Sequence, residues 1–372
     1  MKCIQKNLGT LVPQYPLENI CIPNQTLFID IETTGLYARS SSLYLIGCAY
    51  YDTQTKPYTW RSIQWLATNY EDEEQILKAF LEFVKPYRYL IHFNGNQFDI
   101  PYLENKIEQY YLHFTFDALE GIDIYRRIAP YKAFLKLPNC KQKTIESFLN
   151  TAREDTYTGG ELIEIYHEYV LNGDPQKEHF LLLHNEDDIR GMLEIVAALA
   201  IPDLFHLPVK VTKVHANYYK DIQQKQCSEI IMNLKLPTAL PTDLSYGANN
   251  CYFSGGGTEG KLRVPIFEEE MKYFYSNYKD YYYLPKEDTA IHKSVASFVD
   301  KAYRKQANAH NCYTRKVSSF LPQWEILFTP FFKRNYDDKA LFFELTDELK
   351  TQRDTFNLYA HHILEMMASY KI

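Results

Sequence analysis

One stretch of the sequence decides the fold, and it reads Phe28-Ile29-Asp30-Ile31-Glu32-Thr33-Thr34-Gly35. Residues 27–31 are typical of a short buried strand. Because side chains alternate along a strand, Asp30 and Glu32 share one face. Two carboxylates held this close repel each other unless cations lie between them. Gly35 permits a tight turn that brings backbone close to whatever occupies the site. The stretch therefore predicts a metal site on a strand.

The segments around this strand follow an α/β pattern. Further strands are predicted at residues 44–51, 58–65, 89–93 and 121–125, and helices at 71–84, 100–110, 144–150, 161–171 and 177–200. Three strands in a meander, followed by alternating strands and helices, predict a mixed five-stranded sheet flanked by helices. Pro202 and Pro208 interrupt the long last helix, so we predict two domains, 1–204 and 205–372.

The second domain is predicted to be smaller and α+β. Its expected strands are 209–219, 227–234, 246–253 and 260–275, with a turn at 254–257, and its expected helices are 288–306 and 347–370. Residues 261–316 carry 11 basic and 7 acidic side chains and include a tyrosine-rich run at 275–283. Such a surface can stack bases and hold phosphates of a single strand, as a clamp. The alternative is a tyrosine-rich hairpin packed on its own helix.

Composition sets the protein class. The chain has 372 residues, 46% of them hydrophobic and 23% charged, which is typical of a globular protein. Its net charge is −7, but residues 201–372 carry 22 basic and 20 acidic side chains and the first 200 carry 18 and 27. An acidic half can meet a phosphate backbone if divalent ions neutralise its carboxylates. Seven scattered cysteines, no signal-peptide core and no membrane-length apolar run predict a cytoplasmic protein.

Two further motifs supply polar side chains. Asn94-Gly95-Asn96-Gln97-Phe98-Asp99 follows an apolar strand and places Asp99 at the start of a helix. His184-Asn185-Glu186-Asp187-Asp188 lies within the predicted helix 177–200, where His184 and Asp188, four residues apart, share a face. Carboxylates suit hard ions such as Mg²⁺ or Mn²⁺, and two ions about 4 Å apart can assist phosphoryl transfer. A histidine beside them can deprotonate the attacking water.

The three motifs resemble those of the Asp-Glu-Asp-Asp (DnaQ-like) 3′–5′ exonuclease superfamily, which has a ribonuclease H-like fold. The corresponding residues are Asp30, Glu32, Thr33 and Gly35 in the first motif, Asn94, Phe98 and Asp99 in the second, and His184 and Asp188 in the third. The whole chain looks most like the bacterial YprB-type ribonuclease H-like proteins, and the resemblance covers roughly residues 24–200 in fold. In the histidine branch of the superfamily, the spacing from the histidine to the last aspartate is usually one residue longer than here.

The resemblance implies a site and a reaction. Two divalent ions, Mg²⁺ or Mn²⁺, would be held by Asp30, Glu32, Asp99 and Asp188. His184 would be the base, and Thr33, Gly35, Asn94 and Phe98 would contact substrate. The implied function is 3′–5′ exonuclease cleavage of DNA or RNA, single-stranded or with a free 3′ end. A structure-selective endonuclease and a non-catalytic nucleic-acid-binding module are the alternatives.

Each site residue also has a structural interpretation. Asp99 can cap its helix, Asp188 can be a solvated carboxylate, and His184 can be a packed histidine. Asn94 and Phe98 can shape the loop or the core instead of touching a nucleotide. Asp187 is the rival ligand to Asp188, although it points about 100° away on the helix. The loop around Asp155 has no role that the sequence reveals.

Overall fold

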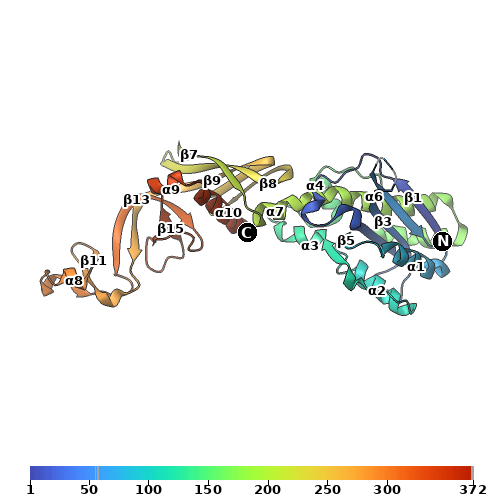
Figure 1. The fold of residues 1–372 in the computed structure, drawn as a ribbon, viewed down its shortest axis with the longest axis horizontal. Helices are drawn as coiled ribbons and strands as arrows, with labels where there is room; N and C mark the ends of the chain where they lie inside the picture. Colours follow the sequence, from blue (N-terminus) through green and yellow to red (C-terminus); the bar gives the residue numbers. More distant parts are fainter. Residues whose placement is uncertain (55, 57, 370–372) are drawn as a thin grey trace. The chain divides into compact units, whose positions relative to one another are not determined.

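The computed structural model describes residues 1–54, 56 and 58–369. The chain divides into two compact units (Figure 1). Unit 1 comprises Met1–Asp203 and the short segment Thr238–Thr242, and unit 2 comprises Leu204–Pro237 and Asp243–Ile372. None of the described helices combines the length and apolar character that crossing a membrane requires.

A mixed six-stranded sheet forms the centre of unit 1. Its strand order is β1-β4-β3-β2-β5-β6. The strands are β1 (Lys2–Asn7), β2 (Thr26–Thr33), β3 (Leu43–Asp52), β4 (Thr59–Leu66), β5 (Tyr89–His92) and β6 (Glu120–Asp123). Strands β1 to β4 pair antiparallel, and β5 and β6 extend the sheet in parallel to β2. The predicted mixed sheet is therefore present, but the count of five strands is one short, because the exposed edge strand β1 was not predicted.

Helices cover this sheet and bring distant segments to its central strand. They are α1 (Glu73–Val84), α2 (Asp99–Gln109), α3 (Ile124–Ile128), α4 (Gln142–Phe148), α5 (Gly159–Asn172) and α6 (Pro175–Ile195). The next helix, α7 (Ala200–His206), includes the boundary between the two units in the sequence. Helix α6 contacts β2, β3 and β4. It approaches closely at Gly47 of β3, where an added Cβ would lie 1.9 Å from Asn185 Oδ1 and 2.3 Å from Ile189 Cδ1. Gly47 pairs with Asp30 across the sheet, so the helix lies beside the predicted site strand.

A buried ion pair joins α1 and α2. Lys106 Nζ lies 2.8 Å from Glu73 Oε1, and both side chains are almost fully buried. Lys106 also donates to the Ser41 carbonyl at 2.6 Å, and Glu73 accepts from the Leu43 N–H at 2.6 Å. The pair thus ties both helices to the segment that connects β2 with β3.

We expect Lys106→Met to lower the free energy of unfolding by about 3 kcal/mol, because it leaves the Glu73 carboxylate buried without a cation. Lys78, which pairs with Glu74 on the surface of α1, is the matched control. Lys78→Met is expected to cost at most about 0.5 kcal/mol. Denaturant unfolding measures both values. Equal losses in the two variants would contradict this role of Lys106.

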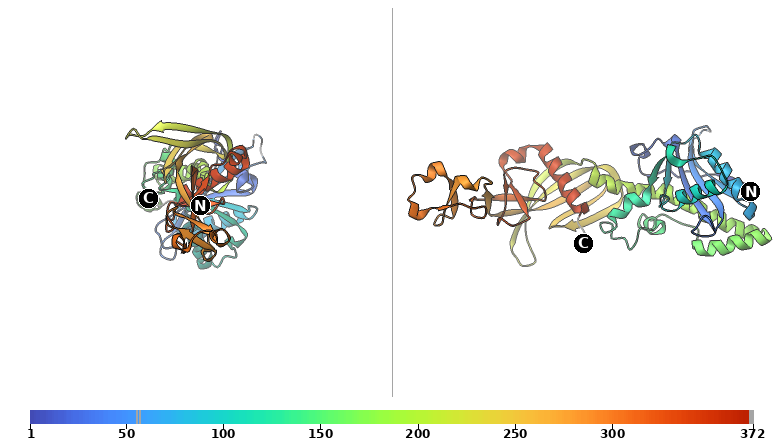
Figure 2. Two further views of the ribbon diagram at one scale, coloured as in Figure 1. Left: turned by 90° about the vertical axis from the view of Figure 1, so that its left-hand side faces the viewer. Right: turned by 90° about the horizontal axis from the view of Figure 1, so that it is seen from below.

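Unit 2 is built on a second six-stranded sheet, with the order β14-β15-β13-β9-β8-β7. Its strands are β7 (Lys210–Lys220), β8 (Gln226–Ala248), β9 (Cys251–Phe274), β13 (Tyr313–Gln323), β14 (Phe331–Phe332) and β15 (Leu341–Glu344). Helix α10 (Arg353–Ser369) is dark red in Figures 1 and 2 and contacts β7. Its Tyr359 hydroxyl donates to the Pro322 carbonyl of β13 at 2.8 Å. The predicted final helix 347–370 is in fact two helices, α9 (Asp347–Thr351) and α10, and Tyr370 lies outside the described residues.

Three predictions for this half were wrong, and one is the strand 246–253, which the structure divides between the end of β8 and the start of β9 with a turn at 249–250. The expected helix 288–306 is replaced by β11 (Thr289–His292), the four-residue α8 (Lys293–Ala296) and β12 (Lys305–Gln306). Strands β11 and β12 both pair with β10 (Tyr281–Leu284), and the apolar stripe that predicted the helix has Val295 and Phe298 exposed. The expected turn 254–257 does not separate two strands either, because β9 runs through it without a break.

Candidate active site

Asp30 and Glu32 extend from the same face of β2, and Asp30 is held by a chain of amides. Asp30 Oδ2 accepts a hydrogen bond from Asn185 Nδ2 at 2.8 Å. Gln64 Nε2 on β4 in turn donates to Asn185 Oδ1 at 2.9 Å, which fixes the direction of the Asn185 amide. Asn185 and Gln64 are both buried. The chain of amides therefore orients one carboxylate before any ligand binds.

Helix α6 brings His184 and Asp188 to Glu32. His184 Nε2 lies 3.2 Å from Asp188 Oδ2 and 3.6 Å from Glu32 Oε1. Ligand atoms of these three residues lie within 4.8 Å of one another, and they form the one such group found among the described residues. The i, i+4 spacing predicted this shared face, and the third motif thus meets the first.

Asp99 is the first residue of α2 and is buried. It follows a tight turn in which Asn94 has a φ of 60°. Asp99 and Asp30 line the same pocket, so the second motif also reaches the site. The structure thus brings together all four carboxylates predicted as ligands, together with His184.

The electrostatics of the cluster favour a bound cation. Burial raises the pKa values of Asp30 and Glu32 well above their ordinary range, and the charge of Asp188 raises both further. Burial also raises the pKa of Asp99 to about 7, although backbone N–H groups oppose the shift. Ionised carboxylates in this arrangement are costly unless a cation offsets their charge. An acidic, oxygen-rich donor set fits hard divalent ions such as Mg²⁺ or Mn²⁺.

The raised pKa of Asp99 predicts a pH dependence of stability. A carboxyl group that binds its proton more tightly in the folded state contributes stability that is full below pH 3.8, its ordinary pKa, and is lost as the pH rises to about 7. We therefore expect the melting temperature of the metal-free protein to fall over this range. In Asp99→Asn the melting temperature should fall less, because asparagine has no carboxyl group to lose a proton. Calorimetry in chelator checks both, and identical pH profiles for the two proteins would contradict the expectation.

The segment 153–155 contacts the same face of α6, and the sequence did not predict this. Arg153 Nη1 donates to Asp188 Oδ1 at 2.7 Å and also contacts Glu146. Asp187 Oδ2 accepts from the backbone N–H groups of Glu154 and Asp155 at 2.9 Å and 2.7 Å. Asp187, the rival ligand, is therefore engaged with this segment, whereas Asp188 lies beside Glu32 and His184. No sequence signal connects residues 32 to 35 positions apart in this way.

Thr33 and Gly35, two of the four residues predicted to contact substrate, belong to the turn after β2. Thr33 Oγ1 donates to the Gly35 carbonyl at 2.9 Å. Asn94 and Phe98 line a pocket of about 500 Å³ together with Asp30 and Asp99. The Asn94 N–H donates to Asp123 at 3.0 Å, and the Asn94 Oδ1 atom is buried without a partner. Asn94 thus shapes the loop and borders the site at the same time.

The tyrosine-rich run in unit 2 is largely engaged in packing. The rings of Tyr275 and Tyr281 stack with centroids 4.4 Å apart, and both pack with Tyr283 against Ala290, Ala307 and Cys312. Arg304 lies 4.8 Å from the centre of the Tyr282 ring. These contacts favour the hairpin interpretation of the tyrosines, with β11 and β12 in place of the expected helix. A nucleic-acid clamp in this region stays a prediction.

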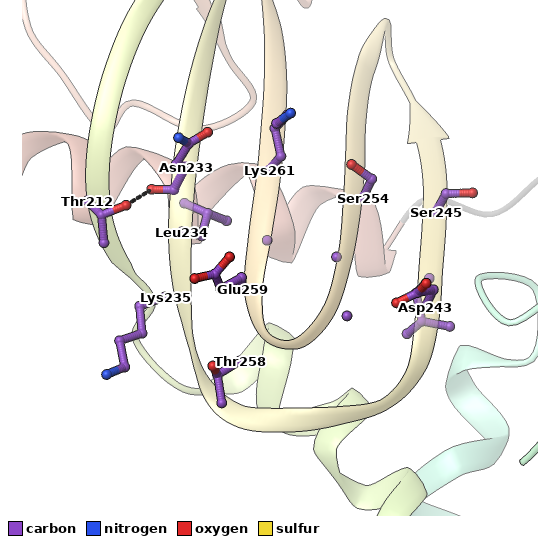
Figure 3. Close-up of a pocket in the computed structure, with 14 residues that line it drawn as sticks. Thr212, Asn233, Leu234, Lys235, Asp243, Ser245, Ser254, Thr258, Glu259 and Lys261 are labelled. Atoms are coloured by element: carbon purple, nitrogen blue, oxygen red, sulfur yellow. Dashed lines mark hydrogen bonds between the residues drawn. The ribbon is translucent and has the colours of Figure 1, made fainter.

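A separate hollow of about 890 Å³ lies on the polar face of β7, β8 and β9 (Figure 3). Lys235 and Lys261 line it together with Asp243 and Glu259, so charges of both signs are mixed. One described contact there is local, from Thr212 Oγ1 to the Asn233 carbonyl at 3.1 Å. The hollow lacks the clustered carboxylates and histidine of unit 1, which remains the candidate site for chemistry.

Comparison with known families agrees with the fold of unit 1. Residues 27–200 match the model of the RNase_H superfamily, and this range contains every predicted ligand from Asp30 to Asp188. The matched part of the chain therefore has a ribonuclease H-like fold, which indicates a nuclease with a nucleic-acid substrate, and divalent metal ions are general in the superfamily. A comparison with curated proteins found no match.

Proposed function

We propose that this ribonuclease H-like protein is a 3′–5′ exonuclease that hydrolyses phosphodiester bonds of DNA or RNA with two divalent metal ions. The single observation that carries the proposal is the convergence of three distant motifs at β2. Asp30, Glu32, Asp99 and Asp188 meet there, with His184 beside Glu32 and Asp188. The superfamily match supports a nuclease, and the exonuclease mode and the polarity rest on the resemblance of the motifs.

The four carboxylates are the residues that would hold the ions. When bound, Mg²⁺ or Mn²⁺ would neutralise charge on the reacting phosphate and on the carboxylates themselves. Asn185 keeps the Asp30 carboxylate directed toward the site. With ions neutralising these carboxylates, the acidic first half of the chain could bind the negatively charged backbone of a nucleic acid.

Hydrolysis adds water across one phosphorus–oxygen bond. The water oxygen bonds to phosphorus, the bond from phosphorus to the leaving sugar oxygen breaks, and that oxygen takes up a proton. His184 Nε2 accepts the proton that water releases and can return it to the leaving oxygen. Its place next to Glu32 and Asp188 puts the base where water and phosphate would meet.

The pocket beside Asp30 and Asp99 is the proposed place for the terminal nucleotide. Phe93 and Tyr125, with ring centroids 5.9 Å apart, line it together with Lys141. Aromatic faces can stack on bases, and an ammonium group can pair with a phosphate. The aromatic and basic lining thus lies directly beside the carboxylate cluster.

The test is a time course with Mg²⁺ or Mn²⁺ on labelled DNA and RNA, each as linear strands with free or blocked 3′ ends and as closed circles. Stepwise release of mononucleotides from free 3′ ends, with circles left intact, is the expected result. Cuts inside circles would replace the proposal with a structure-selective endonuclease. Binding of nucleic acid with no metal-dependent cleavage would replace it with a non-catalytic module.

A further inference from the structure

We propose that Asp155 is a positioning residue that holds the ring of His184 with Nε2 turned toward Glu32 and Asp188. The inference rests on the proposed function, because His184 is the base in that reaction. Asp155 comes from the irregular segment between α4 and α5, and it is 29 residues away from His184 along the chain. It would act through the histidine and without touching substrate.

The contact between the two side chains is short and shielded from solvent. His184 Nδ1 lies 2.7 Å from Asp155 Oδ2, and the side chains are 7% and 1% exposed. An ionised carboxylate only accepts hydrogen bonds, so Nδ1 must carry the proton that is donated to Asp155. The second nitrogen, Nε2, is then the one directed at Glu32 and Asp188. In the neutral ring its lone pair is free to accept a proton from water.

Asp155 is itself fixed at both oxygens. Oδ1 accepts from the Tyr157 N–H at 3.0 Å, while Oδ2 accepts from His184. Lys143 Nζ and Arg153 Nη2 lie 3.3 Å and 3.4 Å from Oδ2. Burial alone would raise the pKa of Asp155, but the Tyr157 N–H, His184 and Lys143 outweigh it and hold the pKa below its ordinary value. The group therefore stays an acceptor.

The backbone of the segment is anchored to the same helix. Asp187 accepts from the N–H groups of Glu154 and Asp155, one helical turn from His184. On the surface of α6, His184 neighbours both Asp187 and Asp188, because residues three and four apart lie next to each other on a helix. One short segment thus sets the directions of His184 through Asp155 and of Asp188 through Arg153. Such a preorganised geometry is what a general base requires.

The test compares Asp155→Asn with Glu154→Gln, a matched loss of one charge at an exposed neighbour. An amide can present N–H to Nδ1 and so favour the wrong tautomer, as in the Ser-His-Asp triad. We expect kcat to fall by about 10²- to 10⁴-fold in Asp155→Asn with KM within about threefold, and little change in Glu154→Gln. Equal kcat values in the two variants would overturn the proposal.

A spectroscopic measurement decides the question without activity. Nitrogen-15 NMR of the histidine rings, assigned with His184→Gln, should show a proton on Nδ1 of wild-type His184 with or without Mg²⁺. An unprotonated Nδ1 in the wild type would overturn the proposal, whether or not Asp155→Asn folds. If the protein cleaves no nucleic acid, the proposed function fails, and the ring measurement still tests the role of Asp155.

Discussion

Asp30→Asn is expected to remove metal-dependent cleavage, with kcat reduced by at least about 1000-fold, or about 4 kcal/mol of transition-state stabilisation. Burial and the charges of Asp188, Glu32 and Asp99 all raise the pKa of Asp30, so its carboxylate interacts with the other three. Asparagine has nearly the same shape, but it lacks the charge that would hold an ion. Initial rates on the preferred substrate at saturating Mn²⁺ measure the effect.

The stability of the same variant separates lost metal binding from lost folding. A ligand that binds only the folded state raises the melting temperature, so Mn²⁺ should stabilise the wild type and not Asp30→Asn. In the presence of chelator, the melting temperature of Asp30→Asn should be no lower than that of the wild type. The reason is that the substitution removes a buried negative charge that neighbouring carboxylates repel. Glu104→Gln, on the exposed side of α2, is the control and should behave as wild type. Full Mn²⁺ stabilisation of Asp30→Asn would exclude Asp30 as a ligand.

His184→Gln is expected to lower kcat by about 10²- to 10⁴-fold, the usual contribution of a general base. The reason is that glutamine cannot accept the proton of water near neutral pH. The variant should keep the Mn²⁺-induced rise in melting temperature, since the four carboxylates are unchanged. Asp30→Asn, in contrast, is expected to lose both the cleavage activity and the Mn²⁺-induced rise in melting temperature.

The control for His184 comes from the same helix. His179 is exposed near the start of α6 and lies outside the group of Glu32, His184 and Asp188, so His179→Gln removes a histidine that is not part of the proposed site. It should keep both activity and metal stabilisation. If His184→Gln instead loses the Mn²⁺ effect, His184 is a metal ligand, as its place in a group with Glu32 and Asp188 also permits.

The local patterns were enough to predict the central elements of unit 1. Asp30 and Glu32 are two residues apart on a buried strand and so share a face of it, and His184 and Asp188 share a helix face, so periodicity alone placed them. Strand β1 was missed because its residues are mostly exposed at a sheet edge and carry no apolar alternation. The pattern of 288–306 predicted a helix because apolar periodicity does not reveal whether a core exists to receive the stripe.

The remaining parts of the site depend on contacts between residues far apart in the chain. Asp155 meets His184 only because the segment after α4 is tied to α6 through Asp187. Gln64 orients Asn185 across 121 residues. A single sequence shows the chemical character of these residues but not their partners. Their roles therefore emerged from the fold.

The close approach of α6 to the sheet requires that residue 47 has no Cβ atom. Opposite Asp30, any larger residue would push Asn185 and Ile189 outward and carry His184 and Asp188 away with them. Gly47→Ala would thus widen the gap between the residues of β2 and those of α6 without altering the chemistry of any ligand side chain. The distance between the carboxylates of β2 and the site residues of α6 therefore depends on Gly47, a residue with no functional group of its own.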